Sequence, residues 1–73
     1  MYLVKQGGGA IHEMCGVEKE DYFPAGTFNI LNNGVVFAKY TTQKARDEEM
    51  RSLFIAIRSG HRLYQFSEDT QIK

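Results

Sequence analysis

The side chains best suited to chemistry are one cysteine and two histidines, Cys15, His12 and His61. Cys15 follows His12 by three residues, so on a regular strand the two side chains would point to opposite faces of a sheet. That geometry does not favour a catalytic cysteine–histidine pair, and the separations of Cys15 from the histidines match no common zinc spacing. Glu48 and Glu49 would diverge by about 100° on a helix. The sequence therefore predicts no catalytic residues, no metal site and no cofactor.

A second group of residues could bind an anion. The segment Lys39–Arg46 leads into a predicted helix, whose first turn offers unpaired N–H groups and about half a positive charge. Lys44 and Arg46 add cations where acidic side chains normally stabilise a helix. The candidate ligand would be a phosphate, or a carboxylate from a partner or from the acidic segment Glu18–Asp21. The candidate anion-binding residues are Lys39, Thr41, Thr42, Lys44 and Arg46.

An alternative for the same residues needs no ligand. Lys44 could be exposed, and Arg46 could lay the aliphatic part of its side chain along the sheet. The double change Lys44→Glu with Arg46→Glu separates the two cases. It should leave the ligand-free protein as stable as before if the residues serve a ligand, whereas a large loss of stability would assign them a structural role.

A helix predicted over about residues 42–59 positions this group. Four large apolar side chains recur at i, i+3, i+4 and i+7, which predicts one buried stripe. They are Met50, Leu53, Phe54 and Ile57. Thr41 or Thr42 can cap the first turn, and Gly60 suits the left-handed residue that follows a helix end.

Two further apolar residues of the helix, Ile55 and Ala56, point away from this stripe. A domain this small buries only about 60% of its unfolded surface, so a second subunit could cover them and enlarge the core. They are the candidate oligomer interface. The alternative is that the aromatic pair Tyr22-Phe23 or the N-terminal hairpin wraps the helix.

The remaining segments predict a sheet. Tyr2–Lys5 and Ala10–Met14 flank three glycines and read as a hairpin. Thr27–Leu31 and Val35–Tyr40 flank Asn33-Gly34, a pair that favours a type I′ turn. His61–Phe66 alternates as a returning strand.

Two segments carry no clear pattern. Cys15–Pro24 contains four successive charged residues and is interpreted as a solvated loop, with Tyr22-Phe23 folded back on the core. Residues 67–73 are polar and predict a frayed tail. The expected fold class is α+β, an antiparallel sheet of four to five strands with a single helix packed on one face, in one domain of residues 1–73.

Composition narrows the function. Nine basic and nine acidic residues give no net charge, which argues against a general duplex-binding protein. No apolar run reaches the roughly 18 to 20 residues that cross a bilayer, and no signal peptide is recognisable. With a single cysteine excluding an internal disulfide, we expect a soluble, cytoplasmic protein without membrane association.

The order of strand, helix, glycine and strand is similar to that of a known group of proteins. The matching positions are Ala38–Thr41, Ala45, Leu53, Gly60 and Tyr64–Phe66. Over about half of its length the chain resembles a loose group of small proteins from phages and prophages of Gram-positive bacteria. The resemblance implies a binding role in the host cytoplasm, such as altering a host protein or blunting a host defence, and brings no catalytic residues with it.

The expectation is a non-enzymatic, homo-oligomeric binding protein that occupies a host partner or sequesters a small phosphate-bearing ligand. The alternative is a nucleic-acid-binding regulator, although the charge balance makes nucleic acid an unfavourable partner. In that alternative, exposed aromatic side chains of the sheet would stack bases beside Lys39 and Arg62. The aromatic residues concerned are Tyr40, Tyr64 and Phe66.

Overall fold

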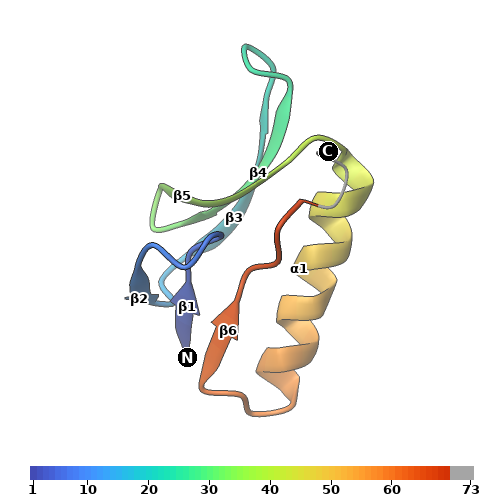
Figure 1. Cartoon of the computed structure of the whole chain (residues 1–73). Helices are drawn as coiled ribbons and strands as arrows, with labels where there is room; N and C mark the ends of the chain where they lie inside the picture. Colours follow the sequence, from blue (N-terminus) through green and yellow to red (C-terminus); the bar gives the residue numbers. More distant parts are fainter. Residues whose placement is uncertain (70–73) are drawn as a thin grey trace.

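The computed structural model describes residues 1–69. Within these residues the chain forms one α-helix and two three-stranded sheets (Figure 1). The elements in chain order are β1 (Tyr2–Val4), β2 (Ile11–Glu13), β3 (Val17–Tyr22), β4 (Thr27–Asn32), β5 (Val35–Tyr40), α1 (Gln43–Arg58) and β6 (Leu63–Gln65). The predicted α+β class is confirmed. The predicted single antiparallel sheet is instead divided in two.

The two sheets differ in strand direction. One has the order β3-β4-β5 and is antiparallel throughout, whereas the other has the order β2-β1-β6 and pairs β1 with β6 in parallel. A parallel partner requires a long crossover, and here α1 lies within the connection between β1 and β6. The alternation of residues 61–66 predicts a strand but does not say which strand it pairs with.

The hairpin of β4 and β5 agrees with the turn residues. Asn33 and Gly34 have φ angles of 53° and 77°, as the predicted type I′ turn requires. In this sheet β4 is the middle strand and β5 lies at an edge. The free edge of β5 is met by Gln6, whose N–H donates to the Phe37 carbonyl and whose Oε1 accepts from the Lys39 N–H at 2.8 and 2.9 Å.

The charged segment interpreted as a loop is the edge strand β3. Its side chains alternate between two faces, and Lys19 and Asp21 reach charged partners on α1. The prediction of a loop was wrong because four successive charges suit an edge strand as well as a solvated turn.

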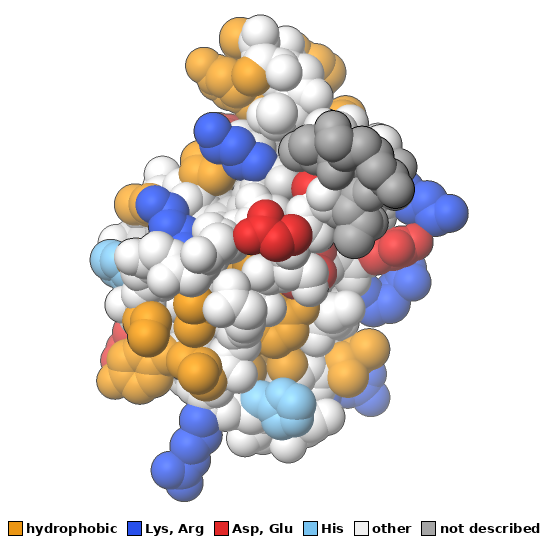
Figure 2. All heavy atoms as spheres, viewed as in Figure 1, with side chains coloured by type: hydrophobic (Ala, Val, Ile, Leu, Met, Phe, Trp, Pro, Cys, Tyr) orange, Lys and Arg blue, Asp and Glu red, His pale blue; other side chains and the backbone are white. Residues whose placement is uncertain are grey.

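The end of the β3–β4 hairpin projects from the rest of the molecule (Figure 1). Phe23, at its turn, is 81% exposed, and Tyr22 is also exposed. Apolar side chains gather at this projecting end in Figure 2. The prediction that Tyr22 and Phe23 fold back as a lid on the core, or wrap the helix, was therefore wrong.

The core lies between the helix and the two sheets. Its largest buried apolar side chains are Leu3, Ile30, Phe37, Met50, Leu53 and Phe66. Phe54 and Ile57, predicted to be buried, are exposed. The helix instead buries a face that is rotated away from Phe54. This buried face includes two charged residues and consists of Arg46, Glu49, Met50, Leu53 and Ala56.

The ends of α1 follow the predicted caps. Thr42 Oγ1 accepts a hydrogen bond from the Ala45 N–H, and Gly60 adopts a φ angle of 76°. The helix of residues 43–58 therefore agrees with the predicted range to within one residue at each end. Of the tail predicted to fray, Ser67 and Asp69 hydrogen-bond to the rest of the chain, and residues 70–73 lie outside the described residues.

Candidate functional site

Arg46, the central cation of the predicted anion site, is buried between α1 and β3, with 2% of its surface exposed. Its Nη1 lies 2.7 Å from Asp21 Oδ1, and its Nε lies 2.8 Å from Asp47 Oδ1. Nη1 also donates to the Glu20 carbonyl at 3.2 Å, and the guanidinium lies 5.5 Å from the centre of the Phe28 ring. The anion that Arg46 binds is thus a carboxylate of its own chain.

The electrostatics of this cluster favour its charged form. Burial lowers the pKa of Arg46, but hydrogen bonds to Asp21 and Asp47 act in the opposite direction, and the net pKa is raised. The hydrogen bond from Arg46 lowers the pKa of Asp47. The cluster joins β3 to α1 as a structural ion pair. Among the ligands considered from the sequence was a carboxylate of Glu18–Asp21, and the carboxylate of Asp21 contacts Arg46.

A second carboxylate of the same chain lies before the helix. The Thr41 N–H donates to Asp69 Oδ2 at 2.8 Å, while Thr42 Oγ1 caps the first turn. Asp69 is buried, and no local pattern pointed to it because it lies in the segment predicted to fray. Two backbone N–H groups near the helix start, those of Thr41 and Ala45, are therefore already hydrogen-bonded within the chain.

The predicted anion-binding residues do not converge. Lys44 and Arg46 are two positions apart on a helix, so their side chains point about 160° apart, and Lys39 is exposed on β5. Arg46 faces β3, while Lys44 lines a different hollow, formed with the segment that follows β6. Thr41 and Thr42 are exposed between them.

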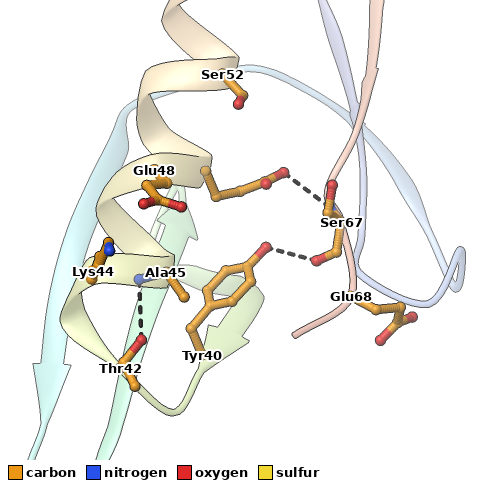
Figure 3. A pocket seen from close by; sticks show the side chains of 9 residues that line it. Tyr40, Thr42, Lys44, Ala45, Glu48, Ser52, Ser67 and Glu68 are labelled. Atoms are coloured by element: carbon orange, nitrogen blue, oxygen red, sulfur yellow. Dashed lines mark hydrogen bonds between the residues drawn. The ribbon is translucent and has the colours of Figure 1, made fainter. Parts of the chain in front are cut away.

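That hollow has a volume of about 500 Å³ and lies between the first half of α1 and the segment after β6 (Figure 3). Its described lining consists of Tyr40, Thr42, Lys44, Ala45, Glu48, Glu49, Ser52, Ser67 and Glu68. Three glutamates face one lysine, so the lining is electronegative. Like charges disfavour a bound phosphate, and the pocket is a poor site for the small anionic ligand predicted from the sequence.

Hydrogen bonds in this pocket hold the C-terminal segment against the helix. Glu49 Oε2 accepts from the Tyr64 hydroxyl at 2.7 Å. The same oxygen accepts from the Ser67 N–H at 2.9 Å, and the Tyr40 hydroxyl donates to the Ser67 carbonyl at 2.7 Å (Figure 3). The pKa values of Tyr40 and Tyr64 are raised well above 10. Burial of the hydroxyls is the largest cause, and the nearby negative charge of Glu49 adds to it. These neutral phenols act as hydrogen-bond donors in a structural network.

The same network bears on the nucleic-acid alternative. Tyr40 and Phe66 are buried in the core, and Tyr64 is partly buried and bonded to Glu49. Base stacking requires exposed ring faces beside cations. These three residues therefore do not form the stacking surface that the alternative predicted.

The described surface contains three apolar regions instead. The hairpin tip holds Tyr22 and Phe23. The second half of α1 exposes Phe54 and Ile55 at 53% and 55%, whereas Ala56 is 5% exposed. Ala56 is packed inside its own chain, which removes half of the predicted oligomer interface.

The third apolar region is the outer face of the β2-β1-β6 sheet. The register aligns Tyr2 with Leu63, and Val4 with Ile11. Residues aligned across neighbouring strands project from the same face, and Leu3, between Tyr2 and Val4, is buried in the core. Tyr2, Ile11 and Leu63 are exposed on the face opposite to Leu3.

Comparisons with protein-family models, with curated proteins and with solved structures found no match. Within residues 1–69, no group of three or more histidine, cysteine or acidic side chains could hold a metal ion. The helix of that same region is too short and too polar to cross a membrane.

Proposed function

We propose that this protein is a non-enzymatic, homo-oligomeric binding protein that acts by occupying a protein partner through exposed apolar side chains. One observation carries the proposal. The charged side chain expected to bind a ligand, Arg46, is paired within the chain, while large apolar side chains are exposed in three separate regions. Exposed apolar patches of this kind mark interaction surfaces. Of the two modes considered from the sequence, occupation of a partner has support and capture of a phosphate-bearing ligand does not.

The outer face of the β2-β1-β6 sheet is the proposed contact for the partner. Tyr2, Ile11 and Leu63 lie on this face, and Glu13 is aligned with Tyr2 and shares it. An apolar centre with a polar rim is the usual composition of a protein interface. The acidic group at its margin favours a partner whose own apolar patch is bordered by a basic residue.

The resemblance to small phage and prophage proteins makes a host protein the expected partner and the host cytoplasm the expected location. Interference with a host defence is one process that fits a non-enzymatic protein of this size. This biological setting is part of the proposal and has its own test. The protein is expressed in the host, and the phenotype is compared between the wild type and a variant of the sheet face.

The biochemical test uses the double variant Ile11→Lys with Leu63→Lys. Both side chains are exposed, so we expect the variant to fold, while two ammonium groups would prevent apolar contact with the partner. Immobilised wild type should retain a defined host protein in stoichiometric amount, and the purified pair should bind with a negative heat-capacity change. The matched control is Val35→Lys, an exposed residue at the edge of the other sheet.

The control should retain the same protein as the wild type, and the double variant should lose it. Equal retention by all three chains would contradict the assignment of the sheet face. Failure of the wild type to form a stoichiometric complex with any host protein would contradict the proposed mode of action.

A further inference from the structure

The turn of the β3–β4 hairpin holds the backbone at Phe23 in a defined conformation. The Gly26 N–H donates to the Phe23 carbonyl at 3.1 Å, and Gly26 has a φ angle of 66°, which suits glycine. Phe23 is 81% exposed at the projecting end of the molecule (Figures 1 and 2). A turn whose backbone is held in place before binding loses less conformational freedom in a complex. The hairpin tip therefore has the properties of a preorganised anchor.

A groove of about 250 Å³ lies beside the same hairpin, between β3 and α1. It is lined by Lys19, Asp47, Met50, Arg51 and Phe54. A cavity of about 150 Å³ lined by apolar groups can hold benzene, so this groove has room for a phenyl ring. Phe54, predicted to be buried in the core, forms part of its wall and is half exposed.

The charges of the tip and the groove are complementary. The strand that leads to Phe23 carries Glu18, Glu20 and Asp21. The groove is bordered by Arg51 and by Lys19, which belongs to β3 itself. Its acidic residue, Asp47, is paired with Arg46 at 2.8 Å and with Lys19 at 3.8 Å, so Arg51 is the cation left to meet an acidic partner. Opposite charges at an interface favour the correct partner and orientation. The best-matched occupant of the groove is therefore an apolar side chain on an acidic strand, which this chain itself supplies.

The spacing of the two features permits a reciprocal contact. Lys19, at the groove, and Phe23, at the tip, are four residues apart, which corresponds to about 13 Å along an extended strand. A twofold axis near Asp21 would bring each tip to the groove of the other copy. Asp21 is paired with Arg46, which reduces repulsion where the two copies meet at the axis. A twofold dimer uses the same patch on both subunits.

We propose that two copies of this chain form a twofold dimer in which Phe23 of each copy inserts into the β3–α1 groove of the other. This inference rests on the proposed homo-oligomer and names its interface. It replaces the predicted Ile55 and Ala56 contact with one centred on Phe23 and Phe54. The two tip-in-groove contacts form together, so the second adds affinity at high effective concentration.

The test measures molar mass by light scattering and sedimentation at micromolar concentrations. The wild type should be a dimer. Phe23→Asp and Phe54→Asp should each be monomeric at the same concentration, with the dimer dissociation constant raised at least about tenfold. Val35→Asp makes the same change at an exposed residue of β5, at the opposite edge of the sheet from β3, and should remain dimeric.

Mixing the two monomeric variants distinguishes a reciprocal contact from other pairings. In a mixed pair, the Phe23→Asp chain supplies an intact groove and the Phe54→Asp chain supplies an intact tip. One of the two contacts is thereby restored, and an equimolar mixture should form a dimer that neither variant forms alone. Circular dichroism of each variant should match the wild type, because both side chains are exposed.

Three results would overturn the inference. A dimer that survives both aspartate variants would place the interface elsewhere and leave the proposed homo-oligomer standing. A mixture that stays monomeric would contradict insertion of the tip of one copy into the groove of the other. A monomeric wild type would contradict both this interface and the proposed homo-oligomer, and would leave the groove for a different partner.

Discussion

The two halves of helix α1 place their side chains in opposite ways. The first half buries a guanidinium and a carboxylate, those of Arg46 and Glu49, because β3 and the segment around β6 bring partners to them. The second half leaves Phe54 and Ile55 exposed next to fully buried Leu53. Side-chain polarity therefore did not decide burial along this helix. The availability of partners elsewhere in the chain decided it.

The neighbours Leu53 and Phe54 give the sharpest test of that comparison. Leu53→Ala should lower the free energy of unfolding by about 3 kcal/mol, because it leaves a cavity in the core. Phe54→Ala, although it removes a larger group, should cost less than about 1 kcal/mol when the protein is dilute enough to be monomeric, because the ring is 53% exposed in a single chain. Urea unfolding measures both. Equal losses for the two variants would show that the second half of the helix is covered.

The first half of the helix is tested by its two cations. Arg46→Ala should destabilise the protein by about 1 to 2 kcal/mol, since it removes a buried guanidinium and its hydrogen bonds. The loss is limited because Asp21 and Asp47 are partly exposed to solvent and Asp47 keeps its contact with Lys19. Lys44→Ala, at an exposed position, should change stability by no more than about 0.5 kcal/mol. Thermal unfolding at equal ionic strength provides the measurement. A stable Arg46→Ala protein would return Arg46 to the list of candidate ligand-binding residues.

The smallest expected effect concerns the tyrosine hydroxyls around Glu49. Folding raises the pKa of Tyr40 and Tyr64 above their ordinary value of 10.0. Their contribution to stability is therefore complete below pH 10 and declines as the pH rises above 10, by about 1 kcal/mol for each tyrosine at one pH unit above that value. Unfolding of the wild type and of Tyr64→Phe should be followed between pH 8 and about pH 11.

The Tyr64→Phe variant should lose less stability over this alkaline range than the wild type, because one titrating hydroxyl has been removed. At pH 8 it should already be less stable, since Glu49 loses a donor. A pH dependence identical to that of the wild type would show that Tyr64 is not held neutral by this network.

Local chemistry predicted several elements correctly. The Asn33-Gly34 turn, the Thr42 cap and the glycine at the end of the helix each depend on residues close to them in the sequence. The carboxylate that pairs with Arg46 was also among the ligands considered from the sequence, because Glu18–Asp21 is conspicuously acidic. The identity of the pairing residue, Asp21, required the tertiary structure.

Other features depended on contacts between distant segments. Two contacts join residues that are far apart in the chain: β6 pairs in parallel with β1, and Asp69 accepts a hydrogen bond from the Thr41 N–H before the helix. The exposure of Phe54 follows from how the helix is rotated on the sheets. A hydrophobic pattern shows that a helix has an apolar stripe, but it does not place the stripe when two charged residues take part in the buried face.

The sequence by itself determined the α+β class, the ends of the helix and the position of the β4–β5 turn, because backbone preferences and caps act over a few residues. Only the tertiary structure decided which charges are paired and which apolar groups remain exposed. Burial depends on what the rest of the chain places against a side chain. Arg46 meets two carboxylates there, whereas Phe23 projects with most of its surface exposed.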